Sequence, residues 1–262
     1  MLTFFVLGDW GRRGSAAQRS VAQGMARAAH RYDPRFVLST GNNFVENGVQ
    51  DVHDAHWTES FQEVYNAPSL SVPWYGALGP RDHEGNITAQ IDYAQHDPRW
   101  RMPNRYYSFN KRVDDRTHAQ FVVLDTTPFT DPRLQGPQEV PSENGASENG
   151  ASENGASENG AATNGVSESG ASEAETSRLQ SARTAFDPTL QRHWFRHMLA
   201  PSRSAWRLVV GHHPIQSANP AHGPTPALQE QLAPLLPSLG VNAYFCGHAH
   251  DLQHLEDEGV HH

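Results

Sequence analysis

The sequence predicts a layered α/β fold, and three observations lead to this prediction. Short apolar runs alternate along the chain with longer segments whose apolar residues recur at helical spacing. Strands and helices that alternate in this way are typical of layered α/β domains. Polar clusters follow directly after several of the apolar runs, which is where open α/β sheets place their sites. The length of 262 residues suits one such domain or two small ones.

The predicted elements can be placed in order along the chain. TFFVLG, residues 3–8, is a short continuous apolar run, as in a strand buried on both faces. The helix predicted over 188–200 has Pro188 in its first turn, where the missing N–H costs nothing. A last helix is predicted over 225–240, broken late by Pro234 and Pro237. Further strands are predicted at 35–40, 72–78 and 119–126 and at the starts of 206–214 and 242–251, and further helices at 15–32 and 54–65.

A low-complexity segment interrupts this pattern at residues 142–177. It contains four perfect SENGA copies and then degenerate ones, with no Lys, no Arg and no bulky apolar residue beyond Val166. Such a chain cannot bury enough apolar surface to offset its ordering entropy, so the segment is predicted to be disordered. Its seven Glu supply most of the formal net charge of −9. The remainder carries no basic field, so no nucleic-acid partner is predicted.

The cysteine count and the hydropathy limit only loosely which cellular compartment the chain occupies. Cys246 is the only cysteine, so no disulfide framework can form within the chain. The first residues show no basic n-region, long apolar stretch or cleavage site, so no signal peptide is predicted. No apolar run approaches the length of a transmembrane helix. The compartment and the oligomeric state stay open.

Three of the polar clusters carry groups that bind metals. Asp9, in LGDWG, predicts either a metal ligand or a turn or helix cap. His212 and His213 follow the strand in VVGHHP. His248 and His250 are two residues apart in an extended segment, so both face one side of the chain and can converge on a metal. Three such loops at strand ends predict a metal site. Other histidines are interpreted as solvated, namely His53, His56, His193, His197, His261 and His262.

Five short blocks resemble the metal-ligand blocks of a known family. GDWG, GNNF, GPRD, VVGHHP and GHAH have the order and setting found in calcineurin-like metallophosphoesterases. Longer stretches, such as VPWYGALGPRDHEGNITAQIDY and VNAYFCGHAHDLQHLED, are similar to the purple, tartrate-resistant acid phosphatases. The resemblance implies an α/β (α+β four-layer) metallophosphoesterase sandwich of two β-sheets flanked by helices. We expect one domain over 1–262, interrupted by the insert at 140–177 and truncated at its C-terminus, since the family fold continues with further strands.

The resemblance also implies a metal centre and a reaction. The family centre holds iron with zinc or manganese, and a metal-bound hydroxide hydrolyses phosphomonoesters. By position, Asp9 and His250 match ligands of the iron, and His212 and His248 match ligands of the second metal. The other matched positions differ. The bridging Asp is Asn42, the tyrosinate ligand is Val45, the Asn ligand is Pro80, and the His that assists the leaving group is Arg81.

These replacements predict a weakened site. Asp9 is the one anionic ligand left, and the neutral oxygen of Asn42 is a poor bridge between two cations. We expect zero or one metal ion, held by a subset of the four matched ligands, since one carboxylate and several imidazoles suit zinc. The candidate catalytic positions are His213 and Arg81. Arg81 stays protonated and cannot act as the acid, but it can contact a phosphate with two hydrogen bonds.

Three functions are compatible with the sequence. The first is an acid-phosphatase-like protein that keeps the fold and the phosphomonoester or phosphate partner but has impaired or lost catalysis. The second is a weak single-metal phosphomonoesterase. The third is a surface or interaction protein that works through the acidic repeat. Family members are secreted or lysosomal, so the resemblance and the missing signal peptide point to different compartments.

Overall fold

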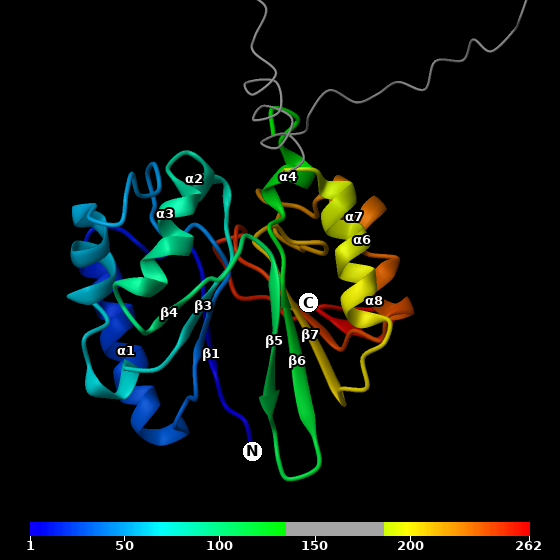
Figure 1. Ribbon diagram of the computed structural model, residues 1–262, viewed down its shortest axis with the longest axis horizontal. Coiled ribbons are helices and arrows are strands. Elements are labelled where there is room, and N and C mark those ends of the chain that lie inside the picture. The colour runs from blue at the N-terminus through cyan, green and yellow to red at the C-terminus, as the bar shows by residue number, and fades with distance from the viewer. Residues whose placement is uncertain (135–185) are drawn as a thin grey trace, which may run out of the picture.

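Residues 1–134 and 186–262 are described by the computed structural model of the chain. The disorder predicted for the SENGA insert at 140–177 therefore lies outside the described residues. In the described part, the strands form two sheets, and helices cover their outer faces (Figure 1). The predicted α/β sandwich of two β-sheets flanked by helices is confirmed.

The first sheet is parallel throughout. Its strands follow the order β1-β2-β3-β4, with every neighbouring pair parallel. The carboxyl ends of all four strands therefore meet at one edge of the sheet. The fourth strand was not predicted, because two residues are too few for a hydrophobic pattern. The strands are β1 (Phe5–Leu7), β2 (Val37–Ser39), β3 (Trp74–Gly76) and β4 (Trp100–Arg101).

The second sheet is mixed. Its strand order is β5-β6-β7-β8-β10-β9. The four inner strands run parallel to one another, and each of the two edge strands pairs antiparallel with the inner strand beside it. The predicted strands at 119–126, 206–214 and 242–251 correspond to three of the inner ones. The strands are β5 (Tyr107–Arg112), β6 (His118–Val123), β7 (Trp206–Val210), β8 (Ala243–Phe245), β9 (Glu256–Asp257) and β10 (Val260–His261).

The long helices begin and end where local signals place them. In α1 (Ala16–Tyr32), the Ser15 side chain accepts a hydrogen bond from the backbone N–H of Gln18, and Asp33 ends the helix in the left-handed conformation. In α6 (Pro188–Leu199), the proline occupies the first turn as predicted. The remaining helices of the described residues are η1 (Trp57–Gln62), η2 (Pro68–Leu70), α2 (Pro80–His83), α3 (Ile87–Asp92), η3 (Tyr93–Gln95), α4 (Thr127–Thr130), α7 (Pro226–Gln231) and α8 (Leu235–Ser238).

Two helix predictions need correction. The helix predicted over 54–65 is a six-residue π-helix, η1, with wider turns than an α-helix. His56, interpreted as solvated, is buried at its start, and its ring lies 5.2 Å from that of Phe44. The helix predicted over 225–240 is two short pieces, α7 and α8, as the two prolines foretold.

Aromatic rings fill the space between the two sheets. The ring of Phe36, beside β2, lies 5.3 Å from that of Phe121 in β6 and 5.9 Å from that of Phe109 in β5, both edge to face. Phe36 and Phe121 are fully buried. Full burial of one such side chain stabilises the fold by about 1.5–3 kcal/mol. This core fixes the strands from whose carboxyl ends the candidate site is built.

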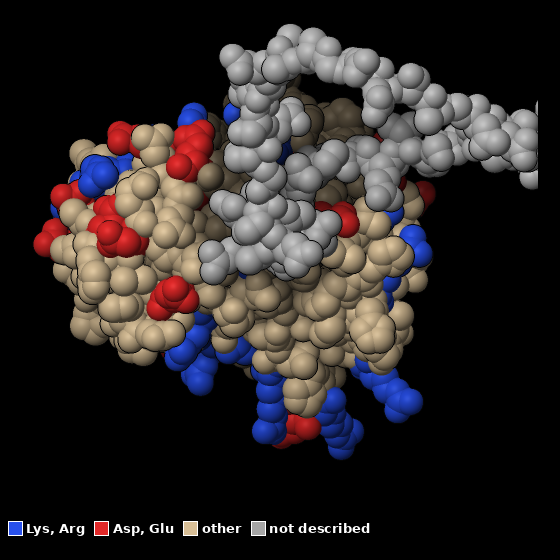
Figure 2. Space-filling model, turned by 45° about the horizontal axis from the view of Figure 1, so that its top comes forward, with Lys and Arg blue, Asp and Glu red and all other residues tan. Residues whose placement is uncertain are grey.

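Charged side chains are unevenly distributed on the surface. Figure 2 shows Lys and Arg gathered along the lower edge of that view, whereas Asp and Glu are more frequent over the side that carries α1 to α3. The net charge of the whole chain therefore describes neither side. Within the described residues, no helix combines the length and the apolar character that crossing a membrane requires.

Candidate functional site

Four of the predicted donor residues share an unusual backbone conformation. Asp9, Asn42, His248 and His250 have φ angles of 56°, 50°, 68° and 57°. Asp, Asn and His tolerate this left-handed region better than other residues with a Cβ, but it still costs free energy. Such conformations gather at ligand sites, where the surrounding structure holds them in place. These residues lie in the loops after β1, β2 and β8, so their conformations indicate that the three loops form a ligand site.

Asp9 joins these loops through its carboxylate. Its Oδ2 accepts a hydrogen bond of 3.0 Å from the backbone N–H of His248. Its Oδ1 accepts one of 2.8 Å from the side-chain amide of Asn42, and the Nε2 of His250 lies 3.6 Å from the same oxygen. The side chain of Asp9 is only 12% exposed. The structure thus brings the Asn42 amide, the His250 ring and the backbone of His248 around the largely buried carboxylate of Asp9.

The orientation of the Asn42 amide is fixed by its partners. Its Oδ1 accepts a hydrogen bond of 2.9 Å from the backbone N–H of Arg81, so its NH₂ group faces Asp9. A Cβ on Gly79 would lie 2.5 Å from that Oδ1, so this loop can approach only because position 79 is glycine. Asn42 therefore offers Asp9 a hydrogen-bond donor where the resemblance predicts a second, bridging carboxylate.

Five histidine rings form a cluster beside Asp9. Ring centroids lie 5.3 Å apart for His212 and His248, 5.0 Å for His213 and His248, and 5.2 Å for His222 and His248. His250 closes the series at 5.6 Å from His222. His222 was missed from the sequence because it precedes α7 instead of following a strand. It lies in AHGPTPALQEQLAPLL, a further stretch that is similar to the purple acid phosphatases, and this similarity was the signal that could have found it.

His212 is fully buried with one free nitrogen. Its Nδ1 lies 2.9 Å from the carbonyl oxygen of Thr40, so Nδ1 carries the proton and donates. Its Nε2 is also buried, and no hydrogen-bond partner for it lies among the described residues. Burial lowers the pKa of His212 to about 4, so the ring is neutral near pH 7. A neutral imidazole with a free lone pair is suited to bind a cation or accept a hydrogen bond from a ligand.

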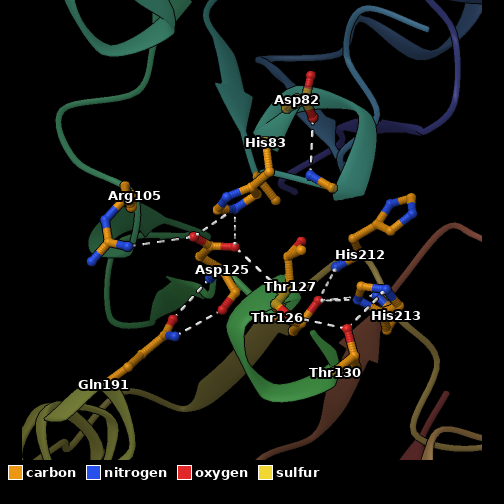
Figure 3. A network of polar contacts seen from close by, with 12 residues as sticks. Asp82, His83, Arg105, Asp125, Thr126, Thr127, Thr130, Gln191, His212 and His213 are labelled. Atoms are coloured by element: carbon orange, nitrogen blue, oxygen red, sulfur yellow. Dashed lines mark hydrogen bonds and ion pairs between the residues drawn. The ribbon is translucent and has the colours of Figure 1, made fainter. Parts of the chain in front are cut away.

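His213 is held by two threonine hydroxyls (Figure 3). Its Nδ1 lies 2.9 Å from Thr126 Oγ1, and its Nε2 lies 3.5 Å from Thr130 Oγ1. The Thr126 oxygen also accepts the backbone N–H groups of His212 and His213, so its own hydroxyl donates to Nδ1. Burial lowers the pKa of His213 to about 2. The predicted catalytic residue is therefore a neutral, firmly held imidazole next to the cluster.

A buried carboxylate supports the loops from below. Both oxygens of Asp82 accept backbone N–H hydrogen bonds, from Asn43 at 3.0 and 3.1 Å, from Phe44 at 3.3 Å and from Gly79 at 2.9 Å. The side-chain amide of Gln90 donates a further one at 2.9 Å. Burial raises the pKa of Asp82 to about 6, despite these hydrogen bonds. Asp82 therefore ties the loop after β2 to the start of α2 and faces no ligand.

A second buried pair lies beside α4 (Figure 3). The Nε2 of His83 lies 2.9 and 3.0 Å from the two carboxylate oxygens of Asp125. Arg105 NH1 lies 3.9 Å from the same carboxylate, and the Gln191 side chain bonds both backbone groups of Asp125 at 2.8 Å. Burial alone would lower the pKa of His83, but the Asp125 carboxylate outweighs it and the pKa is raised. This pair joins α2 to β6 and α6.

The replaced positions lie around the cluster but contribute little to it. The Arg81 guanidinium pairs with Glu84, the residue after α2, at 3.0 and 3.3 Å, and the two side chains are about half exposed. Pro80 begins α2, and the backbone N–H of Val45 donates to Gly11. Neither side chain carries a donor atom. The phosphate contact expected of Arg81 stays a prediction.

The residues do not fit the two-metal centre that the resemblance implies. Within the described part of the chain, no group of three or more His, Cys, Asp or Glu side chains is arranged to hold a metal ion. The carboxylate of Asp9 already accepts hydrogen bonds on both oxygens, one of them from Asn42. Two multivalent cations would face this single carboxylate and no bridging anion.

Comparison with known proteins agrees with the fold. The loops at the carboxyl ends of two facing sheets define a metallophosphoesterase-type sandwich. The calcineurin-like phosphoesterase family model matches residues 2–252, and the chain belongs to that family. It is 33% identical over 257 residues to Purple acid phosphatase 17 of Arabidopsis thaliana, covering 98% of this chain and 64% of that protein. It is also 33% identical over 267 residues to human Tartrate-resistant acid phosphatase type 5, covering 98% and 69%.

The relatives are longer than this chain, and one solved structure supports the fold. The chain spans roughly two thirds of their length, as the shares of 64% and 69% show. The structure titled "GAP50 the anchor in the inner membrane complex of Plasmodium" superposes with a TM-score of 0.71 at 23% identity. It covers 100% of this chain and 70% of that chain. At this identity the match shows the shared fold alone.

Proposed function

We propose that this chain is an acid-phosphatase-like protein that binds phosphate or a phosphomonoester beside the histidine cluster and hydrolyses it slowly or not at all. The observation that carries the proposal is the Asn42 amide, held between Asp9 and the backbone N–H of Arg81. An amide in this place removes one negative charge from the site. It also uses a lone pair of Asp9 that a metal ion would otherwise take.

The groups that would meet a phosphate are of two kinds. A neutral imidazole with a free N–H can donate a hydrogen bond to a phosphate oxygen without the desolvation cost of a buried charge. His213 is such a group, because its Nδ1 accepts from Thr126 and its proton is therefore on Nε2. Arg81 is about half exposed, and its pairing with Glu84 is the kind of surface ion pair that contributes little free energy. Its guanidinium can therefore leave Glu84 for a phosphate, with which it makes charge-assisted, bidentate hydrogen bonds. This supports binding more than turnover.

One observation favours a second candidate, a weak single-metal phosphomonoesterase. The buried Nε2 of His212 has no partner among the described residues and is neutral near pH 7, as a metal ligand must be. These side chains are not arranged as a metal site among the described residues, so a bound ion would have to draw His248, His250 and Asp9 toward that nitrogen. The result would be a donor set of three imidazoles and one carboxylate. That set suits one zinc ion and no iron pair.

The test is turnover and metal content of the purified chain. We expect p-nitrophenyl phosphate hydrolysis between pH 4 and 7, with iron, zinc or manganese supplied, to equal that of His250→Ala. We expect no more than one metal ion per chain by elemental analysis. Hydrolysis well above that of His250→Ala with one bound metal would favour the second candidate. Hydrolysis well above that of His250→Ala with two bound metal ions per chain would overturn both proposals.

A further inference from the structure

The loop between β7 and α7, which carries His222, is tied to the loop after β8 by a side-chain amide. Asn219 belongs to the first loop and reaches the second. Its Nδ2 donates a hydrogen bond of 2.9 Å to the carbonyl oxygen of Ala249 and one of 2.8 Å to Oδ2 of Asp251. These two acceptors lie directly before and after His250 in the sequence. Asn219 therefore joins the backbone that carries one ring of the cluster to the backbone that carries another.

The same amide also shapes its own loop. Its Oδ1 accepts hydrogen bonds from the backbone N–H groups of Ala221 at 2.8 Å and of His222 at 3.1 Å. The hydroxyl of Ser217 donates to the carbonyl oxygen of His222 at 2.7 Å. Both N–H groups and both lone pairs of the Asn219 amide are thus in use. The backbone of His222 is held on its N–H side and on its carbonyl side.

A second amide reaches in the opposite direction. Gln253 belongs to the loop after β8, and its Oε1 accepts the backbone N–H of Ala218 at 2.7 Å. Its Nε2 donates to Oδ1 of Asp251 at 2.7 Å. The Asp251 carboxylate therefore lies between two amides, with one oxygen bonded by each. Hydrogen bonds to a charged acceptor are stronger than those between neutral groups. Asn219, Asp251 and Gln253 form a clasp between the two loops.

The clasp sets the place of the His222 ring. The centroid of this ring lies 5.2 Å from that of His248 and 5.6 Å from that of His250. Among the described residues, no hydrogen bond holds the ring itself. Its position therefore follows from its backbone, which Asn219 holds directly.

We propose that Asn219 is a positioning residue, which keeps His222 beside His248 and His250 so that the three rings form one surface for a phosphate group. This inference rests on the proposed function and adds what holds the binding surface together. Without the clasp, a phosphate would have to order the His222 loop itself. Ordering a loop costs conformational entropy and weakens binding.

The first test is hydrogen–deuterium exchange, read by mass spectrometry, in the full-length wild type and in Asn219→Asp. The carboxylate keeps an acceptor for its own loop, but it cannot donate and it repels Asp251. Amide exchange should therefore rise about tenfold or more in residues 217–223 and also in 248–253. The matched control is Asn110→Asp, the same replacement at an exposed position of β5, which should leave both loops unchanged.

The second test measures the affinity for inorganic phosphate by titration calorimetry at pH 6. It should fall about tenfold in Asn219→Asp, because the loop must then be ordered on binding. The double variant of Asn219→Asp with Asp251→Asn exchanges donor and acceptor and has the net charge of the wild type. It should recover most of the lost affinity. The free energy of unfolding should change little in both variants, because the clasp lies in surface loops.

The outcomes separate this inference from the proposed function. Unchanged exchange in residues 248–253 of Asn219→Asp would overturn the clasp, whether or not the wild type binds phosphate. Equal phosphate affinity in the wild type and in Asn219→Asp would overturn the positioning role, and so would a double variant no better than the single one. If the wild type binds no phosphate while the exchange rises as expected, the clasp is supported and the proposed function is overturned.

Discussion

The candidate site has two parts, a support layer built around Asp82 and Asp125 and a facing surface that carries Asp9, Asn42 and Arg81. The two parts differ in how completely their polar groups are paired for their role. In the support layer, Asp82 accepts hydrogen bonds from four residues, and Asp125 is bonded by His83 and Gln191. On the facing surface, the Asn42 amide donates to Asp9, and Arg81 pairs with Glu84, the residue that follows its helix. The first region is complete as a scaffold, while the second lacks the anions that a metal pair needs.

The difference teaches that a fold and its chemistry can be maintained separately. Removing a group from the support layer leaves buried donors without partners, which destabilises the whole domain. Exchanging a group on the facing surface changes charge where solvent or a ligand can compensate. A chain can therefore belong to the family through its support layer while its reaction is impaired. The predictions below test each side of this comparison.

The largest effect on the free energy of unfolding is expected for Asp82→Ala. The change leaves the backbone N–H groups of Asn43, Phe44 and Gly79 without their acceptor in a fully buried place. Each buried unsatisfied donor costs about 1–3 kcal/mol, so the free energy of unfolding should fall by about 3 kcal/mol or more. Urea denaturation measures it. Asp82→Asn is the control, since an amide oxygen still accepts some of these bonds. A loss as large for Asn as for Ala would contradict this account.

The next effect is a dependence of stability on pH that His213 causes. Burial holds its pKa at about 2, whereas an unfolded histidine titrates near pH 6.5, so below pH 6.5 the unfolded chain binds a proton that the folded chain does not. The contribution of His213 is fully present above pH 6.5 and falls by about 1.4 kcal/mol per pH unit as the pH decreases toward the folded pKa. His213→Asn should make the stability curve between pH 4 and 6.5 less steep. An unchanged slope would be evidence against a neutral His213.

Much of the fold could be predicted because several of its strands are continuous apolar runs in the sequence. TFFVLG gave β1, and the runs at 35–40 and 72–78 gave β2 and β3. β5 was missed because its sequence, YSFNKR, mixes polar and apolar residues that face solvent on one side. β9 and β10 were also missed, because they have two residues each and pair across a turn that a hydrophobic pattern does not predict.

The candidate site could be predicted only where ligands follow strands. Asp9, His212 and His248 were found because each follows an apolar run at the edge where strand ends meet. His222 was missed because it reaches the cluster from a loop before α7. The partner of Asn42 could not be predicted either, since it is the backbone N–H of Arg81. Such a contact depends on how two loops approach and not on which side chains they carry.

Asn42→Asp should restore part of the missing charge. A carboxylate there gives two cations a bridging anion, so the affinity for Zn²⁺ or Mn²⁺ at this site should rise by about tenfold or more. Without metal, two neighbouring carboxylates repel, so the apo variant should be less stable than the wild type. Titration calorimetry and melting with and without metal measure both effects. Asn42→Ala removes the amide without adding charge and should gain no affinity. Equal affinity in all three chains would show that charge is not what the site lacks.

The smallest effect on stability is expected for Arg81→Ala, which separates binding from folding on the facing surface. Its guanidinium pairs with Glu84 in an exposed position, and such pairs contribute about 0–1 kcal/mol, so the free energy of unfolding should hardly change. Phosphate affinity, measured by titration calorimetry at pH 6, should nevertheless fall about tenfold, because a charge-assisted hydrogen-bond donor is lost. Glu84→Gln is the matched control, since it frees the guanidinium and should strengthen phosphate binding. If neither change alters phosphate affinity, Arg81 has no part in the site, and the binding role must rest on the imidazoles alone.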